Sequence, residues 1–322
     1  MNIRNGLWAL LLVSVVALGN DSTGYVGIGG ISYIKNPHIS MQSEDLYISQ
    51  EKIQVAYQFK NLTNRDITET ILFPLPAIPT GVDGDFADVE GMLNSFQIKV
   101  NGKAIKPKRH LSVFFSPYQQ TGNKSIDVTA ELAACGVSEK KLLNIWLLHE
   151  NQIDDQIAAC SNPTIQRLIK KYEDSEFAWE IKVTYSWVQT FKANAITHVE
   201  HRYQPLVGGG IPNKPSMASV ARGELKRFCL DRNFVQKLND RTKGSDSPLI
   251  LTRELSYILT TGANWAKPIG RFTLTIERKP HELVSLCWDK SLKKINATQF
   301  RAVKTHFVPK RDLDILFVPL SE

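Results

Sequence analysis

The 322-residue sequence lacks the short motifs that identify a reaction. It has no G-x-S-x-G elbow, no H-E-x-x-H zinc motif and no glycine-rich phosphate-binding loop. Its cysteines form no C-x-x-C pair and no cysteine–histidine cluster with zinc-ligand spacing. After residue 19 there is no apolar run long enough to span a bilayer, which excludes a multi-spanning membrane protein. We therefore predict no catalytic, cofactor-binding or metal-binding residues.

The charge is mildly basic, with a net value of +7 at pH 7. Basic residues gather at 103–110, 290–294 and 301–311. A contiguous basic patch can bind anionic lipid, lipopolysaccharide or nucleic acid. No aromatic stacking motif accompanies these lysines and arginines, so we expect no nucleic-acid partner. The charge is better interpreted as spread over solvated strand faces.

The first nineteen residues have the pattern of a secretory signal peptide. Arg4 precedes an apolar run from Leu7 to Leu18, and small residues lie at Ala17 and Gly19. The run is shorter than the roughly 20 residues of a membrane-spanning helix. We predict cleavage between Gly19 and Asn20, which leaves a mature chain of residues 20–322 with no transmembrane segment. The periplasm is the expected location, and secretion is the alternative.

Cysteine usage agrees with export. The chain has four cysteines, and an even number in an exported protein predicts two disulfides with three possible pairings. We favour Cys135–Cys160, which closes a predicted helical segment, and Cys229–Cys287, which ties the following segment to a late strand. A catalytic thiol would need an activating base that the sequence does not reveal.

Alternation of apolar and polar residues dominates the mature sequence. Residues 53–60 and 67–73 each read as a half-buried strand, and the turn residues at 61–66 predict a hairpin between them. The run at 179–191 is long for one strand, so we expect a bulge or bend in it. Further strands are predicted at 197–203, 255–260, 272–277, 283–287, 299–308 and 313–317. One-sided alternation is typical of antiparallel sheets packed face to face. The fold class is therefore mainly β, with one large or two packed antiparallel β-sandwiches.

The periodicity becomes helical between about residues 116 and 175. Ser138 is a candidate N-cap for a helix at 139–149, and Asn162 followed by Pro163 opens a second helix at 164–171. We predict a small helical insertion linked by its own disulfide. A shorter helix is expected later, at 231–239.

Three segments contain residues that could form a binding or metal site. The acidic loop 83–90 departs from the EF-hand pattern, and a solvated loop is the better interpretation. His198 and His201 lie three apart on a predicted strand, so they face opposite sides and cannot share a metal. His201 is expected to be packed near Trp187 or Tyr185 and hydrogen-bonded. Gly208–Gly210 matches no phosphate-binding motif and is predicted to be a flexible turn.

Several blocks of sequence carry a family resemblance. They are residues 20–22 (NDS), 35–49 (KNPHISMQSEDLYIS), 73–76 (FPLP), 187–191 (WVQTF), 201–205 (HRYQP), 261–271 (TGANWAKPIGR) and 284–288 (VSLCW). With these blocks the chain resembles a bacterial exported-protein family labelled domain of unknown function 4424. The resemblance implies a periplasmic or secreted location and no established reaction. In 261–265 the residues themselves predict a strand end, a turn at Gly262 and a buried anchor at Trp265.

The sequence thus favours a non-enzymatic exported protein that acts through binding or in an envelope-associated role. The expected partner is an envelope protein or a glycan, without a cofactor, and the oligomeric state is not predicted. The alternative is an envelope hydrolase with an unfamiliar active site, for instance around His201 and the acidic loop 83–90. That alternative requires a cleft in which a base meets a nucleophile or metal within about 3 Å.

Overall fold

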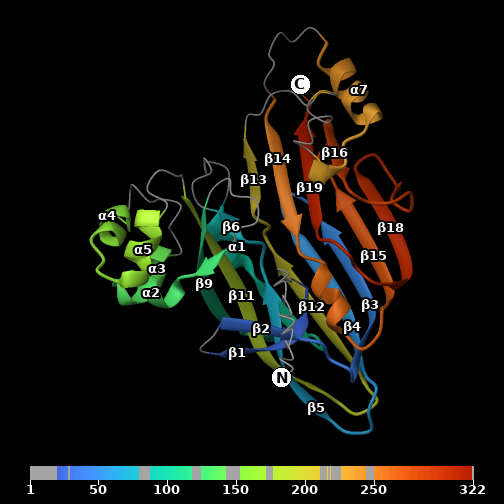
Figure 1. The fold of residues 1–322 in the computed structure, drawn as a ribbon. Coiled ribbons are helices and arrows are strands. Elements are labelled where there is room, and N and C mark those ends of the chain that lie inside the picture. The colour runs from blue at the N-terminus through green and yellow to red at the C-terminus, as the bar shows by residue number, and fades with distance from the viewer. Residues whose placement is uncertain are drawn as a thin grey trace, which may run out of the picture.

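The computed structural model is mainly β, as predicted, and it describes most of the chain after residue 19 (Figure 1). The described residues are 20–27, 30–79, 88–117, 125–142, 153–171, 177–210, 216, 218, 226–243 and 250–320. Their strands form three sheets, and a lobe of short helices extends to one side. Among these residues no helix combines the length and apolar character needed to cross a bilayer. The predicted signal peptide, including Gly19, lies outside the described residues.

The first sheet has seven strands. Its order is β10 (Ile126–Asp127), β9 (Lys108–Pro117), β11 (Phe177–Phe191), β5 (Ile67–Pro74), β1 (Ser22–Gly27) and β2 (Gly30–Ile34), with β6 (Ile78–Pro79) paired to β11. All of its pairs are antiparallel. β11 keeps a continuous register with β9 and then with β5, so the bulge expected in this long strand is not found in its described pairs.

The second sheet has eight strands. Its order is β17 (Lys293–Lys294), β18 (Gln299–Phe307), β15 (Ile269–Glu277), β3 (Ile39–Ile48), β4 (Ile53–Asn61), β12 (Ile196–Tyr203), β7 (Gln97–Val100) and β8 (Lys103–Ile105). β15 and β3 pair in parallel, and the other neighbours pair antiparallel. In this sheet, the strands predicted at 197–203, 272–277 and 299–308 are found within a few residues of those positions, as β12, β15 and β18.

The hairpin predicted between residues 53–60 and 67–73 is wrong. Both strands exist, but β4 belongs to the eight-stranded sheet and β5 to the seven-stranded sheet. The connecting turn crosses between the layers, and Asn61 fixes it by donating to the carbonyl oxygens of Arg65 (2.8 Å) and Phe191 (3.0 Å). Alternation reports that one face of a strand is buried, and it does not specify which strand pairs with it.

The seven- and eight-stranded sheets bury one apolar core between them. Aromatic rings join the layers: Phe59 of β4 lies 6.0 Å from Phe191 of β11 and 4.5 Å from Trp265, measured between ring centroids. Inward-facing residues of both sheets belong to the same cluster of buried side chains. This is the sandwich that one-sided alternation predicts.

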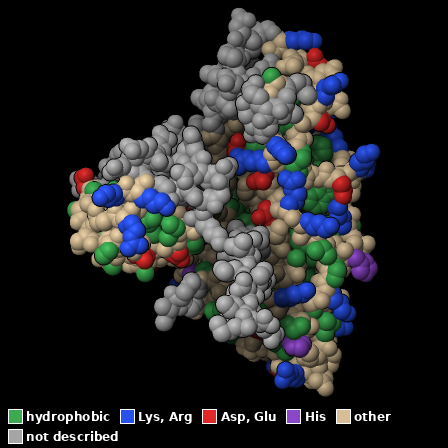
Figure 2. All heavy atoms as spheres, in the orientation of Figure 1, with side chains coloured by type: hydrophobic (Ala, Val, Ile, Leu, Met, Phe, Trp, Pro, Cys, Tyr) green, Lys and Arg blue, Asp and Glu red, His purple; other side chains and the backbone are tan. Residues whose placement is uncertain are grey.

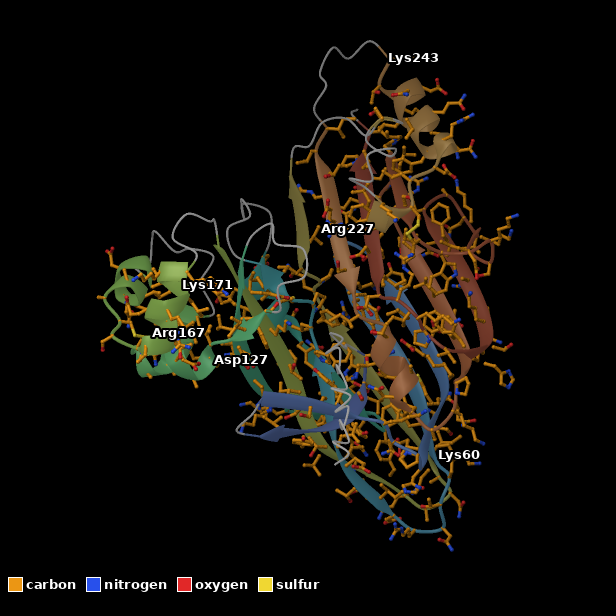
Figure 3. All side chains as sticks on the ribbon, viewed as in Figure 1. Lys60, Asp127, Arg167, Lys171, Arg227 and Lys243 are labelled. Carbon is orange, nitrogen blue, oxygen red and sulfur yellow. A yellow bond between two sulfur atoms is a disulfide. The ribbon has the colours of Figure 1, made fainter. Side chains whose placement is uncertain are left out.

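The third sheet has four strands and lies against one end of the sandwich (Figure 1). Its order is β13 (Val207–Gly210), β14 (Thr252–Tyr257), β19 (Leu313–Pro319) and β16 (Glu282–Leu286). A second apolar cluster forms where η2 (Lys226–Phe228) and α7 (Arg232–Arg241) contribute Phe228 and Phe234 to pack against this sheet. Arg227, labelled in Figure 3, contacts Glu254 of β14. The Cys229–Cys287 disulfide joins η2 to the end of β16, as predicted.

The run Gly208–Gly210 is not a flexible turn. It lies in β13, an edge strand that pairs with β14. A Cβ atom on Gly209 would lie 2.3 Å from the carbonyl oxygen of Thr252, so this close approach of two backbones requires glycine.

The helical insertion forms a separate lobe, on which Figure 3 labels Arg167 and Lys171. It contains α2 (Thr129–Ala134), α3 (Glu139–Leu142), α4 (Ile153–Ala158) and α5 (Pro163–Lys171). Ser138 and Asn162 act as the predicted caps, accepting from the amides of Lys141 (3.3 Å) and Thr164 (2.9 Å). The predicted Cys135–Cys160 disulfide closes the lobe, and residues 143–149 of the predicted helix lie outside the described residues.

Candidate functional site

A β-bulge in β3 determines which of its side chains face the core. The register with β4 shifts between Met41 and Ser43. Before the shift the odd-numbered residues Ile39 and Met41 are buried, and after it the even-numbered residues are buried, beginning with Glu44. A bulge re-aims the side chains that follow it. As a result, Glu44 points into the sandwich and Asp45 points out of it.

The outer face of the eight-stranded sheet is hollowed into a polar groove, which we call the sheet groove. It consists of two adjoining depressions of about 480 and 500 Å³ that share Asp45, Ala56 and Glu200. These three residues are direct cross-strand neighbours on β3, β4 and β12. The small side chain of Ala56 between two carboxylates leaves space at the centre of the groove.

Strand register arranges the groove residues in three rows. The rows are Arg301, Thr275, Tyr47, Gln54, Arg202 and Gln97; then Thr273, Asp45, Ala56, Glu200 and Lys99; then Arg271, Ser43, Gln58 and His198. Each row crosses several strands, so residues that are far apart in sequence share one surface. Alternation along each strand directs these side chains to one face.

The charged side chains of the sheet groove are not paired with one another. Within the described residues, no ion pair closer than 4 Å involves Asp45, Lys99, Glu200, Arg202 or Arg301. Arg301 donates through Nε to the hydroxyl of Thr275 at 3.2 Å. Carboxylates accept and guanidinium groups donate hydrogen bonds, so both kinds of partner remain available to a ligand.

Tyr47 adds an aromatic surface to the groove. Its hydroxyl donates to the carboxylate of Glu277, which also accepts from Gln299 Nε2 at 2.8 Å. Lys52 lies over the ring, with Nζ 5.0 Å from its centroid. Desolvation, followed by the hydrogen bond to Glu277, raises the pKa of Tyr47 to about 12, so the phenol stays protonated at neutral pH. These contacts hold the ring in place as a flat surface with a polar edge.

Beneath the groove, on the inner side of the same strands, lies a cluster of buried polar residues. We call Asn20, Asp21, Glu44, Tyr57 and His201 the buried polar cluster, and each is 2% exposed or less. His201 Nε2 lies 3.0 Å from Asp21 Oδ1, and its ring packs 5.4 Å from that of Trp187. His198, by contrast, is exposed on the outer face. Two predictions are confirmed. The two histidines face opposite sides of the strand, and His201 is packed and hydrogen-bonded.

Trp265 anchors the segment that contains Asp21. It is buried, as predicted, and its Nε1 donates to the carbonyl oxygen of Asp21 at 2.8 Å. Residues 260–264 before it form the 3-10 helix η3 (Thr260–Asn264) rather than a strand end with an open turn. The sequence blocks around Asp21, His201 and Trp265 therefore meet at one place in the fold.

A second groove lies on the outer face of the seven-stranded sheet, beside the β1–β2 hairpin. We call it the hairpin groove; its volume is about 630 Å³, and Tyr25, Lys108 and Val188 line it. Inside it, His110 Nε2 lies 2.7 Å from Ser186 Oγ. Partial burial, followed by the charge of Lys108, lowers the pKa of His110. Sequence reasoning missed this pair because its members lie 76 residues apart on β9 and β11 and match no motif.

The acidic loop lies only partly within the described residues. Residues 83–87 lie outside the described residues, while Asp88 caps α1 (Val89–Ser95) by accepting from the amide of Gly91 at 2.7 Å. Across the described residues, no group of three or more acidic, histidine or cysteine side chains has metal-binding geometry. On the face shown in Figure 2, lysines and arginines are spread among acidic and apolar side chains.

Residues 19–316 match the model of the family described as Domain of unknown function (DUF4424), and the chain belongs to this family. No curated protein matches it in sequence. A crystal structure of a proposed nutrient binding protein from Legionella pneumophila aligns over 93% of this chain and 70% of its own length, with 15% identity and a TM-score of 0.44.

An M1 zinc metallopeptidase from Deinococcus radiodurans aligns over 88% of this chain and 43% of its own, with 9% identity and a TM-score of 0.27. A two-domain M1 zinc metallopeptidase mutant bound to L-tryptophan aligns over 89% of this chain and 44% of its own length, again with 9% identity and a TM-score of 0.27. The chain thus spans less than half the length of these metallopeptidases. All of these likenesses are too distant to assign an activity.

Proposed function

We propose that this protein is an exported binding protein that holds a hydroxyl-rich glycan in the sheet groove. The observation that carries the proposal is the set of unpaired charged groups, of both signs, on one concave sheet face. Sugar hydroxyls donate and accept hydrogen bonds, so they suit a surface that mixes carboxylates, guanidinium groups and glutamine amides. The ring of Tyr47 offers the flat apolar surface on which the carbon face of a sugar packs.

Two features support a location outside the cytoplasm. The structure contains two disulfides, which persist in oxidising compartments and are typical of extracytoplasmic proteins. The predicted signal peptide supports export, and the proposed site of action is the periplasm. Binding in that compartment fits an envelope glycan as the ligand.

Calorimetric titration with soluble bacterial envelope glycans, namely muropeptides and core oligosaccharides, tests the ligand class. We expect one of them to bind, and we expect Arg202→Ala and Asp45→Asn each to weaken binding about tenfold, the loss typical of a charge-assisted hydrogen bond. Arg167→Ala is the matched control, because Arg167 lies on the helical lobe (Figure 3). Failure of every glycan to bind, or equal affinity of all variants, would reject the proposal.

The hairpin groove supports a second candidate function, acyl-ester hydrolysis. A base and a hydroxyl meet there at 2.7 Å, a separation that supports proton transfer from a serine nucleophile to its base. His110 would take the Ser186 proton as Oγ attacks the ester carbonyl, and the departing alcohol would receive that proton. Water would then release the acid and restore Ser186.

A fluorophosphonate probe, which reacts with activated serines, distinguishes this candidate from the glycan-binding one. We expect labelling of the native protein to be lost in Ser186→Ala and in His110→Gln. Ser112→Ala, on the neighbouring strand β9, should label normally. An unlabelled native protein would remove the hydrolase candidate and leave the glycan titration unaffected.

A further inference from the structure

The first described residues of the chain lie in the interior of the sandwich. Asn20, Asp21 and Ser22 are each fully buried. Asn20 Nδ2 donates to both carboxylate oxygens of Glu44 at 3.0 Å. Asn20 Oδ1 in turn accepts from the hydroxyl of Tyr57. The side chain of Asn20 is therefore held firmly at a defined position in the core.

Asp21 and Ser22, the other two residues of this segment, also make hydrogen bonds with side chains of the core. Ser22 Oγ accepts from Asn264 Nδ2 at 3.0 Å, and the Asp21 carboxylate meets His201. A Cβ atom on Gly262 would approach Asn20 Nδ2 to 3.0 Å, so η3 lies tightly against this residue. Contacts from the eight-stranded sheet and from η3 thus enclose the segment.

The cluster holds more acidic than basic groups. Asp21 faces His201, but within the described residues Glu44 has no Lys, Arg or His within ion-pair distance. The ionisable group that acts most directly on Glu44 is the carboxyl of Asp21, the neighbouring Tyr57 and Tyr257 are phenols, and His201 contacts Asp21 rather than Glu44. Burial, against the opposing hydrogen bond from Asn20, raises the pKa of Glu44 to about 8. A buried carboxylate without a counter-ion is costly.

Cleavage between Gly19 and Asn20 would create a positive charge at this position. The new α-ammonium belongs to the residue whose side-chain amide already contacts Glu44. Covalent geometry keeps the two nitrogens of one asparagine within about 5 Å of each other. Because that amide lies 3.0 Å from the Glu44 carboxylate oxygens, the ammonium would lie no more than about 8 Å from them, a separation at which opposite charges still attract in a low-dielectric interior.

We propose that the α-ammonium of Asn20, released by leader removal, is the counter-ion of buried Glu44, so that processing completes the native fold. The proposal rests on the predicted leader cleavage and is independent of the ligand of the sheet groove. Before cleavage an uncharged amide would take the place of the ammonium, and the precursor would be less stable than the mature chain.

Thermal unfolding of chains with defined starts tests this proposal. One chain begins at Asn20, released in vitro from a fusion by a site-specific protease, and the other retains a Gly-Ser extension before Asn20. We expect the extension to lower Tm by at least about 5 °C. The difference should largely disappear in Glu44→Gln and persist in the control Asp45→Asn, whose side chain points out of the sheet.

An equal Tm for the two starts, or the same difference in Glu44→Gln, would overturn the proposal. If Glu44→Gln fails to fold, reactivity of the α-amine provides a second measurement on the unmutated chain. We expect reductive methylation of the folded protein to modify the α-amine at least tenfold more slowly than in urea, and equal rates would also overturn the proposal. Intact mass of protein exported from cells measures cleavage itself, so a failed cleavage prediction is distinguishable from a failed ion pair.

Discussion

Glu44 and Asp45 are neighbours on β3 that face opposite sides of the eight-stranded sheet. Glu44 is 1% exposed and accepts a hydrogen bond from Asn20 in the core, whereas Asp45 lies at the centre of the sheet groove. One strand thus carries a residue of the proposed binding surface and a residue of the buried polar cluster. Because the two share a backbone, an error in the register of β3 would disturb both.

The first prediction concerns the pH dependence of stability. In a chain that retains residues before Asn20, the pKa of Glu44 is about 8 when folded, against an ordinary value of 4.5. The folded state therefore keeps a proton that the unfolded state releases, and stability falls as the pH rises from about 4.5 to 8. Burial also raises the pKa of Asp21, which acts in the same direction. Urea unfolding across this range measures the slope.

Glu44→Gln should flatten most of that slope, because the substituted amide does not titrate. The chain that begins at Asn20 should also show a smaller slope, since its ammonium favours ionised Glu44. A slope that is unchanged in Glu44→Gln would show that another group controls the pH dependence of stability.

The second prediction concerns the Asp21–His201 pair. Both side chains are fully buried, so His201→Phe leaves the Asp21 carboxylate without its partner. We expect a loss of about 3–5 kcal/mol in the free energy of unfolding. His198→Phe, three residues away on the exposed face of β12, should change it by less than about 0.5 kcal/mol. Similar losses in the two variants by chemical denaturation would contradict the burial of this pair.

The third prediction concerns the helical lobe. Cys135 and Cys160 close a segment with a sequence separation of 25, and loop-closure entropy gives such a disulfide about 3.5 kcal/mol. Replacing both with serine should speed hydrogen exchange in α2 and α5. The lobe lies away from the sheet groove, so the glycan affinity should not change. Loss of that affinity in the double variant would show that the lobe contributes to binding.

The fourth prediction concerns the close approach of β13 to β14. Gly209→Val places a Cβ atom against the carbonyl of Thr252, so β13 must move away from the edge of the four-stranded sheet. We expect faster amide exchange in β13 and β14. Gly208→Val is the matched control, because no atom lies within 4 Å of the Cβ position at Gly208. Equal protection in the two variants would contradict this packing.

Much of the local structure was predictable from sequence because its causes are local. Ser138 and Asn162 cap helices through their own side chains, and apolar alternation marks β12 and β15 as strands with one buried face. The Cys135–Cys160 pairing was favoured among three because these two residues flank the predicted helical segment. The opposite orientations of His198 and His201 followed from the two-residue period of a strand.

The candidate sites were not predictable in this way. Asp21 and His201 are 180 residues apart, and the rows of the sheet groove join residues from six strands. His110 and Ser186 meet through the pairing of β9 with β11, and no sequence motif marks either residue.

The sequence by itself determined which segments are strands or helices and where their apolar faces lie, since these depend on neighbouring residues. Only the tertiary structure decided that β4 and β5 join different sheets and that the bulge in β3 turns Glu44 inward. Those choices depend on the sum of long-range pairings and packing across the sandwich, in which each strand competes for several partners. The same long-range packing places the segment after the predicted cleavage site in the core.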